Sequence, residues 1–202
     1  MCGICGQIRF DGQPGNPDLV LRMRKSLRHR GLDDEGLWHM DFGGGGIAVG
    51  HTRLSIIDLS PWGQQPMFDI SKRYCIVYNG EVYNYKELRE NLANVGCIFK
   101  TKTDTEVVLN AYIKYGIDCL KLFNGMYSFV VWDSKNKSLF CARDRLGIKP
   151  FYYRCQGNRF YFASEIKALL LTSNGAPDPN PIAVYDYLSL GLMHHEQHTF
   201  FK

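Results

Sequence analysis

Short strand-like segments joined by tight turns limit the folds open to this chain more than any other feature. The second half has turn sequences at residues 134–137 and 156–158, each lying between two such segments. Strands connected by such short links pair as antiparallel sheets. The four segments are Gly125–Asp133, Ser138–Asp144, Phe151–Arg154 and Phe160–Ala163.

The first half adds further strands and one helix. Asn16 followed by Pro17 is typical of a helix start, and Gly31 is expected to end this helix. The apolar face of the helix consists of Leu19, Val20, Met23 and Leu27. Strand-like runs occupy Gly6–Phe10, Gly36–Phe42, Ile47–Ile57 and Tyr74–Tyr78.

A pair of helices is predicted between the two groups of strands. Asn84 and Glu87 have capping-box spacing for a helix that ends near Gly96, and Thr103 or Asp104 caps a second helix. Helices placed between antiparallel sheets in the sequence must cover the outer faces of those sheets. The predicted fold class is therefore α+β, a layered sandwich.

The composition is that of a soluble globular chain. Of 202 residues, 45% are hydrophobic and 22% are charged, which argues against disorder and coiled coil. No apolar run approaches the roughly 18 residues that span a bilayer, and residues 1–10 do not resemble a signal peptide, so we expect a cytoplasmic protein without membrane contact. The net charge of +4 does not indicate nucleic acid, and we expect the basic residues from Arg22 to Arg30 to form a solvated helix face rather than a nucleic-acid contact.

The seven cysteines are odd in number and widely scattered, which favours buried thiols over disulfides. Cys2 and Cys5 have C-x-x-C spacing, but no second pair follows at zinc-site distance, so we expect neither a metal nor a redox dithiol there. His194 and His198 lie four residues apart near the C-terminus, where a polar chain end is expected rather than a metal site.

The composition changes after residue 173. Residues 174–181 read NGAPDPNP, which is typical of a linker, and a short amphipathic helix is expected at Ile182–Leu190. We therefore expect one domain at residues 1–173, followed at 174–202 by a linker and the start of a further domain.

Cys2 has the clearest chemical signal. Once Met1 is removed, a thiol and a free α-amine share one residue. The amine titrates near pH 8 and the thiol near 8.5, so the amine can accept the thiol proton without a histidine. Position alone does not distinguish such an N-terminal nucleophile from an ordinary cysteine.

Several motifs in order resemble the class II glutamine amidotransferase domain, in particular the N-terminal half of glutamine-hydrolysing asparagine synthetase. They are CGICG at 2–6, HRGLDDEG at 29–36, HTRLSIIDLS at 51–60, QQPM at 64–67, YNGEVYNYKELR at 78–89, TDTE at 103–106, FNGMYSFVVWD at 123–133, RDRLGIKPFYY at 143–153 and SEIKAL at 164–169. The resemblance implies the four-layer αββα sandwich of N-terminal-nucleophile hydrolases. Leu32 replaces the usual proline of the HRGPDDEG motif.

The resemblance also implies a role for each matching residue. Cys2 attacks the side-chain amide of glutamine, while the Asn79 amide and the Gly80 N–H form the oxyanion hole. Substrate is bound by Arg53 at the α-carboxylate and by Asp104, Glu81 and the Gly80 carbonyl at the α-ammonium, and Leu54, Ile56 and Asn84 line or support the pocket. Asp33, Asp34 and Arg143–Arg145 are expected to be structural.

The expected activity is hydrolysis of L-glutamine to L-glutamate and ammonia, without a metal or organic cofactor. The ammonia would pass to a C-terminal synthetase domain or partner chain that converts aspartate to asparagine with ATP and Mg²⁺. Residues 1–202 lack the SGGxDS-type loop of such a synthetase domain, so this chain alone is expected to perform only the glutaminase half-reaction. Two alternative functions remain open: a glutaminase serving another amide- or amine-forming partner, and a non-catalytic glutamine-binding module if Met1 is retained. Assembly as a homodimer is also left open by the sequence.

Overall fold

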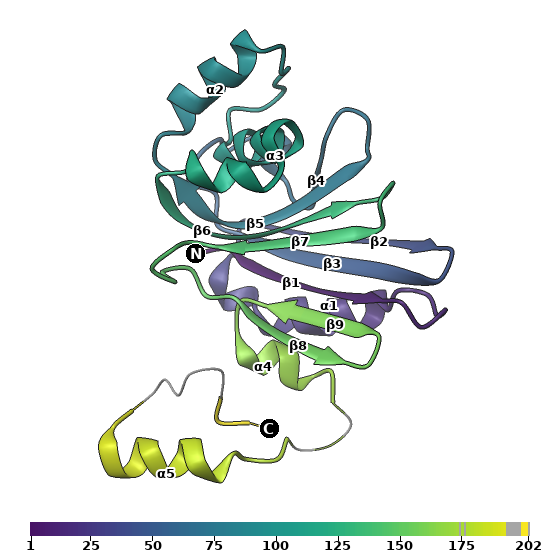
Figure 1. Cartoon of the computed structure of the whole chain (residues 1–202), viewed down its shortest axis with the longest axis vertical. Coiled ribbons are helices and arrows are strands. Elements are labelled where there is room, and N and C mark those ends of the chain that lie inside the picture. The colour runs from purple at the N-terminus through teal and green to yellow at the C-terminus, as the bar shows by residue number, and fades with distance from the viewer. Residues whose placement is uncertain (174, 176, 193–198, 202) are drawn as a thin grey trace.

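Two antiparallel sheets form the centre of the computed structural model, which describes residues 1–173, 175, 177–192 and 199–201 (Figure 1). The first sheet has the order β2-β3-β1-β9-β8. Its strands are β1 (Gly3–Arg9), β2 (Asp34–Phe42), β3 (Gly45–Arg53), β8 (Tyr152–Gln156) and β9 (Arg159–Ala163). The second sheet has the order β4-β5-β6-β7, with β4 (Met67–Phe68), β5 (Tyr74–Val82), β6 (Gly125–Asp133) and β7 (Ser138–Arg143).

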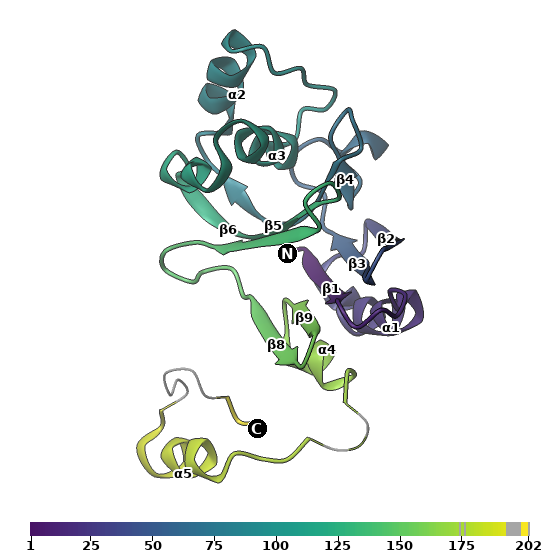
Figure 2. The same ribbon diagram turned by 45° about the vertical axis from the view of Figure 1, so that its right-hand side comes forward.

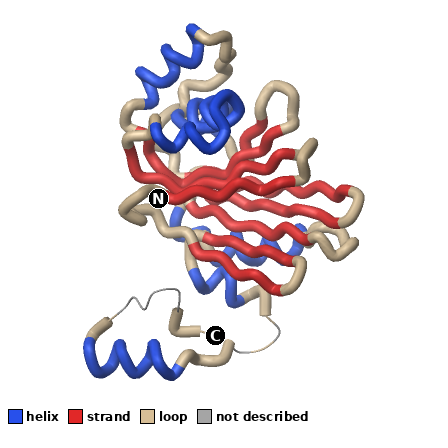
Figure 3. The backbone as a smooth tube through the Cα atoms, in the orientation of Figure 1, coloured by secondary structure: helices blue, strands red, loops and turns tan. Residues whose placement is uncertain are grey.

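Helices cover the outer faces of both sheets (Figures 2 and 3). They are α1 (Pro17–Ser26), α2 (Tyr85–Asn94), α3 (Asp104–Tyr115), α4 (Ile166–Leu170) and α5 (Pro181–Leu190). The first sheet packs against α1 and α4, and the second against α2 and α3. Both views show α5 set apart from the sandwich.

Three apolar clusters hold the layers together. One fills the space between the two sheets and contains Ile4, Val77, Trp132 and Phe162. The second lies under α1 and α4, and the third lies under α2 and α3. Side chains that alternate along a strand point to opposite faces, so a strand such as β1 contributes to two clusters and is buried on both sides. The result is the predicted α+β sandwich with layers in the order αββα.

Strand β1 lies in the middle of the first sheet and places the N-terminus between the two sheets (Figures 1 and 2). It pairs with β3 from Gly3 to Arg9 and with β9 from Cys5 to Arg9. The Ile4 N–H donates to the Ser164 hydroxyl at 3.0 Å, which extends the attachment of β1 to the end of β9. The chain is therefore held on both sides directly after Cys2.

Several element boundaries differ from those expected. β3 ends at Arg53 rather than at residue 57, because its partner strands reach no further: β1 pairs up to Thr52 and β2 up to Arg53. Asn84 occupies the N-cap position of α2, but the predicted capping box is wrong. The Asn84 amide instead donates to Leu122 O and accepts from Asn124 N, which connects α2 to the start of β6.

The basic segment from Arg22 to Arg30 is less solvated than expected. Arg24 pairs with Glu35 at 2.8 Å, and Arg30 pairs with Glu165 at 2.8 Å; both arginine side chains are largely buried. The expectation of a uniformly solvated face was therefore wrong for these two residues, because the segment packs against β2 and the start of α4.

The C-terminal predictions are met in part. Helix α5 matches the short helix expected at residues 182–190, and Asn180 caps it by accepting the Ile182 N–H. The expectation for His194 and His198 falls outside the described residues. In the part of the chain that the structure describes, no helix is both long and apolar enough to cross a membrane.

Candidate active site

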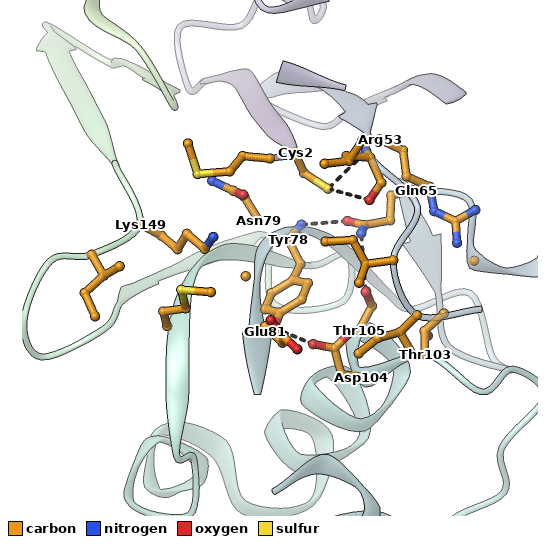
Figure 4. Close-up of a pocket in the computed structure, with 18 residues that line it drawn as sticks. Cys2, Arg53, Gln65, Tyr78, Asn79, Glu81, Thr103, Asp104, Thr105 and Lys149 are labelled. Carbon is orange, nitrogen blue, oxygen red and sulfur yellow. Dashed lines mark hydrogen bonds between the residues drawn. The ribbon is translucent and has the colours of Figure 1, made fainter. Parts of the chain in front are cut away.

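A cavity of about 360 Å³ opens at the N-terminal end of β1 (Figure 4). It lies where the end of β3, the middle of β5 and the first turn of α3 meet, with the segments 54–65 and 148–149 at its edges. All eight residues assigned to the catalytic and substrate-binding groups line it: Cys2, Arg53, Leu54, Ile56, Asn79, Gly80, Glu81 and Asp104. The structure therefore brings together residues that are up to 102 positions apart in the sequence.

The Cys2 thiol is held by the backbone of the segment after β3. The Leu54 N–H donates to Cys2 Sγ at 3.4 Å, and Sγ lies 3.7 Å from Leu54 O (Figure 4). Leu54 thus contacts the thiol through its main chain, while Ile56 is an exposed residue at the edge of the cavity. The Cys2 carbonyl accepts a 2.9 Å hydrogen bond from Arg30 Nε, which fixes the residue from the other side.

Burial raises the pKa of the Cys2 thiol. The Leu54 N–H, the N-terminal ammonium and the Arg53 guanidinium oppose this rise, and the Asp104 carboxylate adds to it. Because the net shift is upward, the thiol is protonated at neutral pH and requires a base before it can attack a carbonyl carbon. No histidine is among the described residues that line the cavity.

Cys5 has different surroundings, although it is only three residues away. It is buried in the cluster under α1, and its Sγ lies 3.8 Å from both Val20 O and Gly50 O. Burial raises the pKa of this thiol to about 12. The seven cysteines are all free thiols, and Cys5 belongs to the packing of the outer layer rather than to the cavity.

Asn79 and Gly80 follow each other near the end of β5. Asn79 is buried, and its Nδ2 has no hydrogen-bond partner, which is uncommon for a buried amide donor. Gly80 lies so close to β6 that an added Cβ would stand 2.6 Å from Met126 O and 2.8 Å from Tyr127 Cα. A side chain is therefore excluded at position 80, where β5 passes the cavity.

Asp104 is a buried carboxylate in the first turn of α3. Its Oδ2 accepts from the Tyr78 hydroxyl at 2.7 Å and from Val82 N at 3.1 Å (Figure 4). Thr103, rather than Asp104, caps the helix by accepting the Glu106 N–H at 3.2 Å. Burial raises the pKa of Asp104, and the Tyr78 hydroxyl is the largest influence that lowers it. Asp104 together with Glu81 gives this side of the cavity an anionic character.

Arg53 also lines the cavity and occupies the last position of β3. Its Nη1 donates to Ser60 O at 3.1 Å, and its Nη2 donates to Asp58 O. Gly63 makes room for it, since a Cβ added at position 63 would overlap Arg53 Nη2. A planar guanidinium held in this way keeps further N–H groups for a carboxylate.

Sequence reasoning assigned no role to several residues of the cavity. Gln65 accepts the Tyr78 N–H at 2.7 Å and donates to Thr105 Oγ1 at 3.3 Å, so one side chain connects β5 to α3. The Lys149 side chain is also buried against the cavity. Gln65 and Lys149 both lie within motifs that carry the family resemblance. The motifs could have pointed to these residues, but they do not indicate which side chains contact each other.

The remaining assignments divide into two groups. Asn84, which was expected to line or support the pocket, does not line the cavity; it connects α2 to the start of β6. Asp33, Asp34 and Arg143–Arg145 were expected to be structural, and none of them lines the cavity. Asp144, for example, accepts from Lys149 N and Ile148 N at 2.9 Å each, and so shapes the segment that reaches the cavity.

The sequence of the chain matches the glutamine amidotransferase domain family over residues 1–202. The chain belongs to this family. Curated relatives of the amidotransferase domain include a Methanocaldococcus jannaschii protein provisionally named glutamine-hydrolysing asparagine synthetase 2, with 44% identity over 96% of this chain and 40% of the relative. Glutamine-hydrolysing asparagine synthetase 3 of Bacillus subtilis is 44% identical over 84% of this chain and 27% of its own length. The amidotransferase domain thus spans less than half the length of these relatives.

A solved structure confirms the fold class. Glutamine phosphoribosylpyrophosphate amidotransferase from Bacillus subtilis matches the amidotransferase domain with a TM-score of 0.70 and 21% identity. The match covers 88% of this chain and 45% of that enzyme. The likeness confirms the fold of the amidotransferase domain, in which two antiparallel sheets lie between layers of helices in the order αββα.

Proposed function

We propose that this domain hydrolyses L-glutamine to L-glutamate and ammonia through a covalent intermediate on Cys2. The observation that carries the proposal is the arrangement around the thiol: an unpaired amide donor at Asn79 lines the same cavity as the Asp104 carboxylate and the Arg53 guanidinium. These are the groups needed to stabilise an oxyanion and to bind the two charged ends of an α-amino acid. No metal or organic cofactor takes part in the proposed reaction.

The reaction begins with proton transfer. After removal of Met1, the α-amine of Cys2 accepts the thiol proton, and the thiolate attacks the side-chain carbonyl carbon of glutamine. Asn79 Nδ2 and the Gly80 N–H stabilise the negative charge that develops on the carbonyl oxygen. Losing one such donor typically costs on the order of 3 kcal/mol of activation free energy.

The tetrahedral intermediate then collapses. Its nitrogen takes a proton from the α-ammonium of Cys2 and leaves as ammonia, and a γ-glutamyl thioester remains on Sγ. The α-amine next deprotonates a water molecule that attacks the thioester, and glutamate leaves as the thiol is restored. The α-carboxylate of glutamine is bound by Arg53, and its α-ammonium by Asp104, Glu81 and the Gly80 carbonyl.

The ammonia acceptor is proposed from the relatives. Two of them carry the name asparagine synthetase, and this chain corresponds to 40% and 27% of their lengths. We propose that ammonia passes to an ATP- and Mg²⁺-dependent synthetase domain, in the same protein or in a partner chain, that forms asparagine from aspartate in the cytoplasm. A second candidate is transfer to a different acceptor, because a 38% identical relative from Gibberella zeae is named Amidase chry2.

The test is glutamine-dependent ammonia release by the chain with Met1 shown by intact mass to be absent. Cys2→Ala should abolish release while leaving glutamine binding nearly unchanged, because the thiol forms the new bond and other residues hold the substrate. Cys5→Ala is the matched control and should retain activity. Full loss in a folded Cys5→Ala protein, or turnover by Cys2→Ala, would contradict the mechanism.

A further inference from the structure

A second cavity, of about 430 Å³, lies on the outer side of the first sheet, beneath α1 and the end of α4. Four arginines line it: Arg9 of β1, Arg22 of α1, Arg154 of β8 and Arg159 of β9. None of the described residues that line it is an aspartate or a glutamate. It is separate from the Cys2 cavity, with which it shares no lining residue among those described.

The pairing of three adjacent strands brings these side chains together. The first row across β1, β9 and β8 consists of Arg9, Arg159 and Gln156, which lie opposite one another. The next row on the same face consists of Gln7, Tyr161 and Arg154. The following row, Cys5, Ala163 and Tyr152, belongs to the apolar cluster under α1. The face that packs against helices therefore changes from apolar to basic at one end of the sheet.

Two arginines opposite each other in an antiparallel pair repel. Here Asp11 offsets part of this repulsion: Arg9 donates to both of its carboxylate oxygens, at 2.7 and 2.8 Å, and Arg159 donates to one of them at 2.7 Å. Arg9 and Arg159 hold the pKa of Asp11 well below its ordinary value. The single carboxylate of Asp11 therefore offsets charge only at Arg9 and Arg159 of the four arginines.

The other two arginines have no carboxylate partner among the described residues. Arg154 Nη1 donates to the hydroxyls of Thr172 and Ser173. The Arg22 side chain makes no hydrogen bond or ion pair with any part of the chain that the structure describes. Neutral partners leave the charge of Arg154 uncompensated, so the cavity has an excess of positive charge together with hydroxyl and amide groups.

We infer that this cavity is a binding site for a small phosphorylated molecule. Planar guanidinium groups bind phosphate oxygens in pairs, and converging arginines favour phosphate over a single carboxylate. The volume lies within the range of small-molecule sites, roughly 300–1,000 Å³, and exceeds what one phosphate group fills. Arg22 and Arg159 are exposed at the rim of the cavity, while Arg9 and Arg154 are half-buried. The four arginines gather around one cavity instead of forming an extended row, which argues against a nucleic-acid backbone as the ligand.

The test is calorimetric titration of the 202-residue chain, at constant ionic strength in chloride buffer, with inorganic phosphate, ribose 5-phosphate and ribose. We expect saturable binding of ribose 5-phosphate with Kd below about 1 mM and no binding of ribose. Tighter binding of ribose 5-phosphate than of inorganic phosphate assigns the site to phosphorylated metabolites, and equal binding assigns it to the phosphate group alone.

Matched variants locate the binding. Arg22→Gln and Arg154→Gln should each weaken ribose 5-phosphate binding by about tenfold or more. Arg28→Gln removes the same charge from an exposed side chain outside the cavity and should leave binding unchanged. Thermal unfolding of each variant checks that it is folded. Absence of saturable binding up to about 10 mM, or an equal loss in Arg28→Gln, overturns the proposal.

Discussion

The Tyr78 hydroxyl donates a 2.7 Å hydrogen bond to Asp104 Oδ2, so β5 and the first turn of α3 are joined at a buried carboxylate in the Cys2 cavity. Burial raises the pKa of Tyr78 well above its ordinary value, which keeps the phenol protonated and able to donate. The same hydrogen bond lowers the pKa of Asp104 against the effect of burial. Tyr78 thereby helps to keep the proposed ammonium acceptor ionised.

Tyr78→Phe should therefore shift the acidic limb of the glutaminase pH profile to higher pH. Without the hydroxyl, the pKa of Asp104 rises further, so the carboxylate is lost at a higher pH and KM for glutamine increases several-fold near that limb. The measurement is kcat/KM from pH 5 to pH 8. Tyr127→Phe removes a hydroxyl from the neighbouring core outside the cavity and should change neither the acidic limb nor KM. An unshifted acidic limb in Tyr78→Phe would show that Tyr78 does not keep Asp104 ionised.

Arg53→Lys should weaken glutamine binding by more than about tenfold, since a lysine ammonium cannot hold a carboxylate in two places while also bonding the Ser60 and Asp58 carbonyls. Calorimetric titration in the Cys2→Ala background measures affinity without turnover. Arg28→Lys, at an exposed side chain, is the control. Unchanged affinity in folded Arg53→Lys would place the carboxylate elsewhere.

A form that retains Met1 should not hydrolyse glutamine, even though its thiol is present. Met1 lines the cavity, and an amide-linked Cys2 nitrogen has no basic lone pair with which to accept the thiol proton. The comparison uses two preparations separated by one methionine in mass and measures ammonia release by each. Equal rates from both would show that another group deprotonates Cys2.

Asp133→Asn should lower the free energy of unfolding by about 1–3 kcal/mol. The carboxylate of Asp133 accepts from Arg73 at 2.8 and 2.6 Å and from Lys135 N at 3.0 Å, and its pKa is lowered to about 2. Because the pKa of Asp133 is lower in the folded state than in the unfolded state, its ionised carboxylate stabilises the fold at pH values above the unfolded-state pKa. This stabilisation is lost as the pH falls toward about 2.

Urea unfolding between pH 2 and pH 7 measures this effect. The difference between wild type and Asp133→Asn should be largest at neutral pH and should shrink as the pH falls through this range. Asp118→Asn removes an exposed carboxylate that pairs with Lys121, and it should change stability by less than about 0.5 kcal/mol. A constant difference across the pH range would mean that the charge of Asp133 is not responsible.

The sequence predicted the layered fold because its signals are local. Asn16 and Pro17 start α1, and Asn180 caps α5, through contacts within three residues. Strand alternation likewise depends on neighbouring positions, so every strand except β4 was located to within four residues at each end. The two residues of β4 are too few to show an alternating pattern. Asn84 was harder to predict, because contacts with Leu122 and Asn124 replace the capping box.

The contacts within the cavities could not be predicted in this way. Gln65 connects Tyr78 to Thr105, across separations of 13 and 40 residues, and no periodicity or cap marks such a contact. The same holds for Arg30, whose Nε reaches the Cys2 carbonyl across 28 positions. The pairing of Arg9 with Arg159 depends on register between strands about 150 residues apart, which composition and local pattern do not contain.

The position of β1 between β3 and β9 has a consequence for biosynthesis. Ile4 bonds to Ser164 across 160 positions, so the strand that follows the nucleophile obtains its second neighbour only after nearly the whole domain has left the ribosome. Pairing of such distant segments is slow, because a large loop must close before the contact forms. A nascent or truncated domain would therefore hold its first strand on one side only, and the proposed release of ammonia would begin only in chains whose synthesis has passed the end of β9.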